Sequence, residues 1–255
     1  MTSVPVFFSF ARSGGTLVNQ LLGTHPDCLV LSEVNPAVCC KSLEDQAVEW
    51  LHLIEPAEAG SFRQLEYAEQ IRELHARAAT RRRRLVVRDW PIVNFVPRSS
   101  QDVAPSAVLE QRTYLHMAAI DIVPLVIARR GSDVFRSCMH NFEQFENVNL
   151  ISFSRQYLCY AKAVSHYPVV HLERLRENPR RGVAEILKAF ELPIDNNLDY
   201  ILQNFHNFQR CTGNNTLRRP AESSTATTIL NPSIRADRTD IGVEFEEADR
   251  LLGYD

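Results

Sequence analysis

Short apolar segments typical of buried β-strands alternate along this chain with longer segments of helical periodicity. Strands are expected at 4–10, 28–33, 85–87, 123–130 and 167–175, and helices at 16–26, 40–54, 62–80, 108–120, 132–142, 178–193 and 244–255. The strands are apolar on both faces, so they predict a parallel sheet covered by helices on both sides. We therefore expect an α/β fold, a three-layer α/β/α arrangement with a central parallel sheet, and a single domain over 1–255.

Composition excludes several classes of function. The chain has 255 residues, of which 45% are apolar, and a net charge of −3, so no overall positive field attracts nucleic acid or a membrane surface. No apolar run reaches membrane-spanning length, and the run at 4–10 lacks the basic start of a signal peptide. The six cysteines include no C-x-x-C pair, which indicates reduced thiols in a cytoplasmic protein and offers no metal site.

The segment between the first strand and the first helix has the composition of an anion-binding loop. A helix start presents free backbone N–H groups and the positive end of the helix dipole. Glycines allow close approach of a ligand, hydroxyls donate hydrogen bonds, and arginine adds a bidentate positive charge. The candidate residues are Arg12, Ser13, Gly14, Gly15, Thr16 and Leu17. The Walker lysine is absent, and the alternative is a tight turn with a surface arginine.

A second strand end repeats this layout. Arg129 follows an apolar strand, and Ser137 lies eight residues later on the expected helix 132–142. Because parallel strand ends gather at one edge of a sheet, Arg129 can reach the same ligand as Arg12. The alternative is an ion pair of this arginine with Asp133 or Glu143.

Five motifs, in order along nearly the whole chain, resemble the PAPS-dependent sulfotransferases in their bacterial and tyrosylprotein-sulfotransferase-like branch; PAPS is 3′-phosphoadenylyl sulfate. They are ARSGGTLVNQLLGTHPDCLVLSE, ARRGSDVFRS, VVHLERLRENP, TGNNTLRRP and LLGYD. The resemblance implies a fold related to the P-loop kinases. It also implies transfer of a sulfuryl group from PAPS to a hydroxyl or amine, with 3′,5′-ADP as product and no metal.

The same resemblance assigns roles to residues. The first motif would bind the 5′-phosphosulfate, Arg129 and Ser137 would hold the 3′-phosphate, and Arg218 and Arg219 would lie over the cofactor. The chain departs from the family pattern at three places. Gly15 replaces the first threonine of the usual pair, Arg130-Gly131 replaces Asp/Asn-Pro, and Arg88 takes the place of a lysine with no histidine after it.

Sulfuryl transfer needs cations on the transferred group and a base for the proton of the acceptor. Arg12 and Arg88 are the expected cations. Glu33, at the end of the second strand, is the expected base, because the tyrosylprotein branch has its catalytic glutamate at this place. A partner role for Glu33, with an arginine of the site, is the alternative. Asp89 is the second choice of base, and His116 and His140 are further alternatives on helices.

Two other functions stay open from the sequence. One is a binding module that retains 3′,5′-ADP without transfer, and the other is a nucleotide or small-molecule kinase with a degenerate P-loop. The acceptor, a small molecule or a peptide, is not identified, and neither is the oligomeric state. We expect the helices at 40–80 and the loop at 207–240 to form the acceptor pocket.

Overall fold

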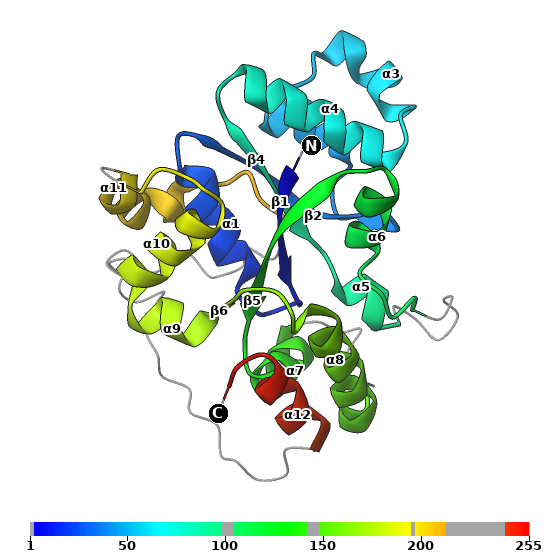
Figure 1. Ribbon diagram of the computed structural model, residues 1–255, viewed down its shortest axis with the longest axis vertical. Helices are drawn as coiled ribbons and strands as arrows, with labels where there is room; N and C mark the ends of the chain where they lie inside the picture. Colours follow the sequence, from blue (N-terminus) through cyan, green and yellow to red (C-terminus); the bar gives the residue numbers. More distant parts are fainter. Residues whose placement is uncertain (1–2, 98–104, 142–147, 195–196, 213–242, 255) are drawn as a thin grey trace.

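The computed structural model describes residues 3–97, 105–141, 148–194, 197–212 and 243–254. Its strands form one sheet in the order β3-β2-β4-β1-β5-β6 (Figure 1). Five strands are parallel: β1 (Ser3–Ser9), β2 (Cys28–Asn35), β4 (Arg84–Asp89), β5 (Asp121–Ala128) and β6 (Val169–His171). The short edge strand β3 (Val38–Cys39) is antiparallel to β2 and was not predicted.

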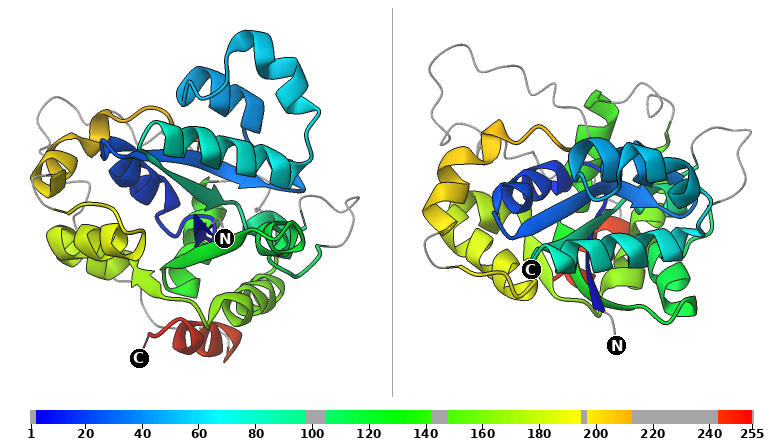
Figure 2. Two further views of the ribbon diagram at one scale, coloured as in Figure 1. Left: turned by 45° about the horizontal axis from the view of Figure 1, so that its top comes forward. Right: turned by 90° about the horizontal axis from the view of Figure 1, so that it is seen from above.

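Successive residues of the central strand β1 pack on opposite faces of the sheet, as strand geometry requires. Phe7 belongs to a core with α1 (Gly15–Thr24), α10 (Pro179–Ala189) and α11 (Asn197–Asn204). Phe8 belongs to the core on the other face, with α4 (Tyr67–Thr80), α6 (Glu110–Met117), α8 (Leu150–Val164) and α12 (Val243–Leu251). Figure 2 shows helices on both sides of the sheet. The predicted α/β class with helices on both faces is therefore confirmed.

The loops that follow β1 and β5 lead directly into helices. Gly15 begins α1 and Gly131 begins α7 (Gly131–Asn141). β6 is followed at once by α9 (Leu172–Glu177), so the predicted strand 167–175 was too long. It ends where its neighbour ends, because His171 pairs with Ala128, the last residue of β5. The helix α8 was not predicted.

The segment 40–54, predicted as one helix, consists of the short α2 (Leu43–Asp45) and the π-helical turn η1 (Gln46–Trp50). After this turn the N–H of Leu53 bonds to the carbonyl of Ala47 at 2.8 Å, which closes a wider loop than an α-helix makes. The helix predicted at 62–80 is likewise divided, into α3 (Ala59–Arg63) and α4, because Glu66 has extended backbone angles.

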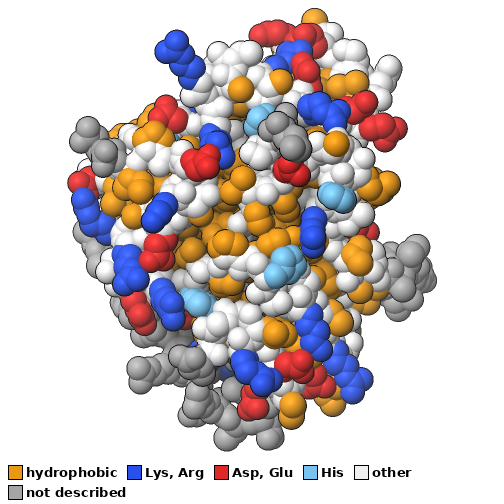
Figure 3. Space-filling model, in the orientation of Figure 1, with side chains coloured by type: hydrophobic (Ala, Val, Ile, Leu, Met, Phe, Trp, Pro, Cys, Tyr) orange, Lys and Arg blue, Asp and Glu red, His pale blue; other side chains and the backbone are white. Residues whose placement is uncertain are grey.

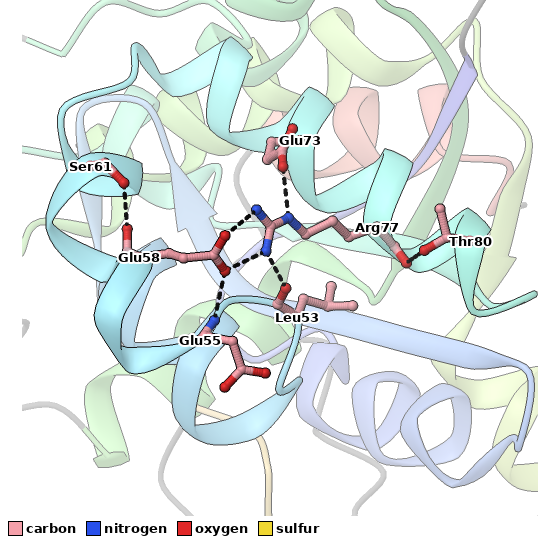
Figure 4. A network of polar contacts seen from close by, with 7 residues as sticks. All are labelled: Leu53, Glu55, Glu58, Ser61, Glu73, Arg77 and Thr80. Atoms are coloured by element: carbon pink, nitrogen blue, oxygen red, sulfur yellow. Dashed lines mark hydrogen bonds and ion pairs between the residues drawn. The ribbon is translucent and has the colours of Figure 1, made fainter.

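Arg77 on α4 contacts the residues that follow the π-helical turn (Figure 4). Its guanidinium donates to Glu58 Oε2 at 2.8 Å, to Glu73 Oε1 at 2.6 Å and to the carbonyl of Leu53 at 3.1 Å. Glu58 ends the 3₁₀ turn η2 (Pro56–Glu58). Gln70 of α4 adds a hydrogen bond to the carbonyl of Leu65 at 2.9 Å, so the segment after β3 is anchored to α4 by side chains of that helix.

The surface carries both hydrophobic and charged side chains. On the face shown in Figure 3, hydrophobic side chains gather in the middle and charged side chains lie mainly around them. Among the helices that the structure describes, none is long and apolar enough to cross a bilayer.

Candidate functional site

The loop after β1 has the backbone geometry of an anion cradle. Arg12 and Gly14 have φ angles of 68° and 94°, and the N–H of Ser13 bonds to the carbonyl of Phe10 at 3.0 Å. No side chain caps the start of α1, so the first N–H groups of that helix are available to a ligand. The Ser13 hydroxyl is buried and has no hydrogen-bond partner among the described residues, while Thr16 and Leu17 are half-buried at the start of α1.

The structure brings together Arg12 and Arg129, the two arginines that follow the ends of β1 and β5. Arg12 Nε donates to Ser137 Oγ on α7 at 3.0 Å, and Arg129 Nη1 donates to the carbonyl of Arg12 at 3.2 Å. Burial lowers the pKa of the Arg12 guanidinium, and the charge of Arg129 acts in the same direction. Two positive guanidinium groups this close repel each other, so an anion bound beside them is favoured.

The predicted alternative for Arg129, an ion pair with Asp133, is absent. Asp133 Oδ1 instead lies 3.8 Å from Arg136 Nη1, and within the described ranges Arg129 has no carboxylate partner. Glu143, the other possible partner, lies outside the described residues, as do Arg218 and Arg219 of the late loop.

Contacts from the end of the chain and from α8 hold the loop that carries Arg129. The N–H of Gly131 donates to Asp249 Oδ1 at 2.8 Å, and the hydroxyl of Tyr157 donates to the carbonyl of Arg129 at 2.6 Å. Burial raises the pKa of Asp249 to about 6. These partners come from distant parts of the sequence, which gave no signal for them.

Glu33 and Arg88 form a buried ion pair. A bulge in β2 causes this, because Leu31 pairs with Val87 and Val34 pairs with Asp89, so two residues of β2 face Arg88 alone. Glu33 has a φ of 51°, and its Oε1 accepts from Arg88 Nη2 at 2.6 Å. Their side chains are 11% and 7% exposed. The structure thus contains the arginine-partner arrangement that the sequence left as an alternative for Glu33.

Gln46 holds this bulge, and the sequence did not identify it. Its fully buried amide accepts from the N–H of Ser32 at 2.7 Å and donates to the carbonyl of Ser32 at 2.9 Å. These are the backbone groups that a bulge would otherwise leave unpaired. Thr212 also contacts the bulge and the ion pair. Its N–H donates to Ser32 Oγ at 3.0 Å, and its carbonyl accepts from Arg88 at 3.2 Å.

The glycine at position 15 has a direct structural reason. A Cβ atom on Gly15 would lie 2.2 Å from Ser9 Oγ, 2.9 Å from Arg88 Nε and 3.0 Å from Arg88 Nη2. A threonine here, as in the related motif, would occupy the place of this guanidinium. Arg88 therefore lies directly beside the first turn of α1 because residue 15 has no side chain.

Asp89, the second choice of base, points away from this pair, since successive strand residues face opposite sides. It is completely buried, and its Oδ1 accepts from Asn35 Nδ2 at 3.0 Å, while Asn35 also donates to Asn94 Oδ1 at 2.9 Å. Burial raises the pKa of Asp89 to about 7.

Two further alternatives for the base are histidines on helices. His140 is on α7, the helix that also carries Ser137, and His116 lines a cavity of about 490 Å³ between α6 and α8, whose lining includes none of the other candidate residues. Cys40, after β3, lies beside Glu33; burial and that carboxylate raise the pKa of its thiol to about 12. Within the described ranges no three His, Cys, Asp or Glu side chains gather in a way that could hold a metal ion.

Comparison with solved structures finds this fold in sulfotransferase domains. The domain from the Synechococcus PCC 7002 olefin synthase matches with a TM-score of 0.61 and 14% identity, over 100% of this chain and 96% of that chain. The domain from the curacin biosynthetic pathway matches with a TM-score of 0.59 and 12% identity, over 100% and 99%. No protein-family model and no curated protein sequence matches. At these identities the likeness establishes the fold, and the chain has the α/β fold of sulfotransferase domains.

Proposed function

We propose that this protein transfers a sulfuryl group from PAPS to a hydroxyl or amine of a small-molecule or peptide acceptor. The main support is the meeting of Arg12, Arg129 and Ser137 at the carboxyl edge of the sheet, with the Arg88–Glu33 pair beside the first turn of α1. This edge is where open α/β sheets bind their ligands.

The residues present fit a nucleotide with two phosphorylated ends. The first turn of α1 offers N–H groups that no described side chain caps, and the loop before it offers the buried hydroxyl of Ser13, which suit the 5′-phosphosulfate. Arg129 and Ser137 suit the 3′-phosphate, because a guanidinium without a carboxylate partner favours an oxyanion.

When bound, PAPS would supply the sulfuryl group. In this proposal Arg12 and Arg88 neutralise charge on the transferred group, and Glu33 accepts the proton of the acceptor. Glu33 is favoured over Asp89 because it contacts Arg88 directly, whereas Asp89 is enclosed on the opposite face of β4. Arg88 orients the carboxylate through the hydrogen bond between Nη2 and Oε1.

The experiment compares two nucleotides and then measures transfer. Isothermal titration should show that 3′,5′-ADP binds at least about tenfold more tightly than 5′-AMP, which lacks the 3′-phosphate, since a charge-assisted contact contributes about 1.5–3 kcal/mol. Labelled PAPS should then transfer sulfuryl to members of a panel of phenols, alcohols and amines in the presence of EDTA.

Two results would replace this function with another. Tight, selective binding of 3′,5′-ADP without transfer to any acceptor, including peptide tyrosine, would indicate a binding module. Mg²⁺-dependent phosphoryl transfer from ATP, with no selectivity for the 3′-phosphate, would indicate a kinase.

A further inference from the structure

Arg176 on α9 lies within the motif VVHLERLRENP, which assigned it no role. Leu172 of the same helix is buried against the loop after β1, and a Cβ on Gly14 would lie 2.6 Å from Leu172 Cδ1. Residues four apart lie on the same face of a helix. Arg176 therefore leaves α9 on the side of the loop that carries Arg12.

Among the residues that the structure describes, the guanidinium of Arg176 has no carboxylate as a counter-ion. The residue is half-buried, its Nε is buried without a hydrogen-bond partner, and no ion pair joins it to a carboxylate in the described ranges. The two carboxylates whose charges act on Arg176 already have other partners. Glu173 accepts from the Tyr254 hydroxyl at 2.7 Å and from the N–H of Arg130 at 3.5 Å, and Asp133 faces Arg136.

The arginines of the next helix behave differently. Arg180 pairs with Asp199, and Arg181 Nε lies 2.9 Å from Glu185 Oε1. On α9 itself neither Arg174 nor Arg176 forms an ion pair within the described residues, but Arg174 is exposed, whereas Arg176 is half-buried and lies close enough to Arg129 to feel its charge. Burial lowers the pKa of Arg176, and the charge of Arg129 lowers it further. Two half-buried positive charges with no carboxylate partner among the described residues cost free energy, unless an anion binds to both.

We infer that Arg176 and Arg129 together bind one phosphate monoester dianion, and that this dianion is the 3′-phosphate of the bound nucleotide. The inference rests on the proposed function for the identity of the nucleotide. Arg176 is then a specificity residue, because it distinguishes a 3′,5′-bisphosphate from a 5′-monophosphate. Its guanidinium supplies the second positive charge that a dianion requires.

The test is titration of 3′,5′-ADP and 5′-AMP into the wild type, Arg176→Gln and Arg174→Gln. Arg174 is an exposed arginine of the same helix whose removal changes the net charge equally. Arg176→Gln should weaken 3′,5′-ADP binding by about 10- to 100-fold and leave 5′-AMP binding within about twofold, as expected for one charge-assisted contact. Arg174→Gln should leave both affinities within about twofold, and Arg176→Lys should recover part of the selectivity.

Thermal unfolding gives a second readout that a merely structural arginine would not produce. Without ligand, Arg176→Gln should unfold at the same temperature as the wild type or higher, because an unpaired half-buried charge is removed. A variant that keeps the wild-type selectivity, or that loses affinity for both nucleotides equally, would overturn the inference.

A wild type without preference for 3′,5′-ADP would instead refute the proposed function and the nucleotide part of this inference. Inorganic phosphate then tests the anion site alone. Stabilisation of the wild type by phosphate, lost in Arg176→Gln and kept in Arg174→Gln, would retain the assignment of a phosphate site. Equal stabilisation of all three proteins would overturn that as well.

Discussion

Replacement of Glu33 by Gln tests the proposed base most directly. The substitution keeps the shape of the side chain and an oxygen that accepts from Arg88, but it removes the proton-accepting charge. Proton transfer by a positioned base contributes about 10²–10⁴ in rate, so turnover should fall by that factor. The affinity for 3′,5′-ADP should change by less than about threefold, because Glu33 contacts Arg88 rather than the loop that holds the phosphates.

The buried pair also sets a cost in stability. Removing one partner of a buried ion pair typically costs about 3–5 kcal/mol, because the other charge stays unpaired. The glutamine retains a hydrogen bond to Arg88, so we expect a loss of about 2–3 kcal/mol, or about 5–10 °C in the unfolding midpoint. Glu33→Ala, which retains neither, should lose more.

The assay is single-turnover transfer from labelled PAPS, at a temperature where circular dichroism shows every variant folded. Glu44→Gln is the control, because Glu44 on α2 is also ion-paired, with Arg63, and its side chain is 12% exposed; this variant should keep the wild-type rate. Glu33→Gln should show the loss of turnover without a comparable loss of nucleotide affinity. If this variant keeps most of its turnover, or loses nucleotide affinity as well, the base assignment is wrong, and Asp89→Asn should then show the loss.

Three further outcomes are expected. Gly15→Ala should destabilise the protein by about 1–3 kcal/mol and lower turnover, because its methyl group would lie 2.9 Å from Arg88 Nε; an unchanged unfolding midpoint would contradict this. Gln46→Met and Gln111→Met, at two fully buried amides, should both lower the midpoint, but the first alone should lower turnover, because Gln46 holds the bulge of β2. Asp89 keeps its proton in the folded protein up to a pKa of about 7, against 3.8 when unperturbed, so the free energy of unfolding should fall as the pH rises from about 4 to 7, by up to ~4 kcal/mol. Chemical denaturation at several pH values in this range should show that the free energy of unfolding depends less on pH in Asp89→Asn than in the wild type. An unchanged pH dependence would refute the argument.

The sequence predicted those features that follow from regular geometry. Alternating apolar strands and helices gave the layers of the fold, and parallel strand ends gave the proximity of Arg12 and Arg129, since both follow strands that are neighbours in the sheet. The pattern could not predict the bulge at Glu33, because extra residues in a strand look like any other apolar–polar sequence. Gln46 was missed for a similar reason, since a buried glutamine 14 residues from its partner Ser32 carries no local signal.

Arg176 was missed for a different reason. A basic residue near the end of a charged helix is usually solvated, so charge alone did not distinguish it from Arg174 or Arg180. The distinction depends on which neighbours already have partners, and that is known only once α9 is placed beside the loop after β1.

The position of β1 between β4 and β5 divides the site between two halves of the sheet. Arg129 and Arg176 come from the half with β5 and β6, whereas Glu33 and Gln46 come from the half with β2 and the segment after it. Substitutions in the second half can alter the fit of an acceptor without touching the contacts proposed for the nucleotide. Under the proposed function, a lineage of such proteins can therefore acquire a new acceptor while it inherits its donor site intact.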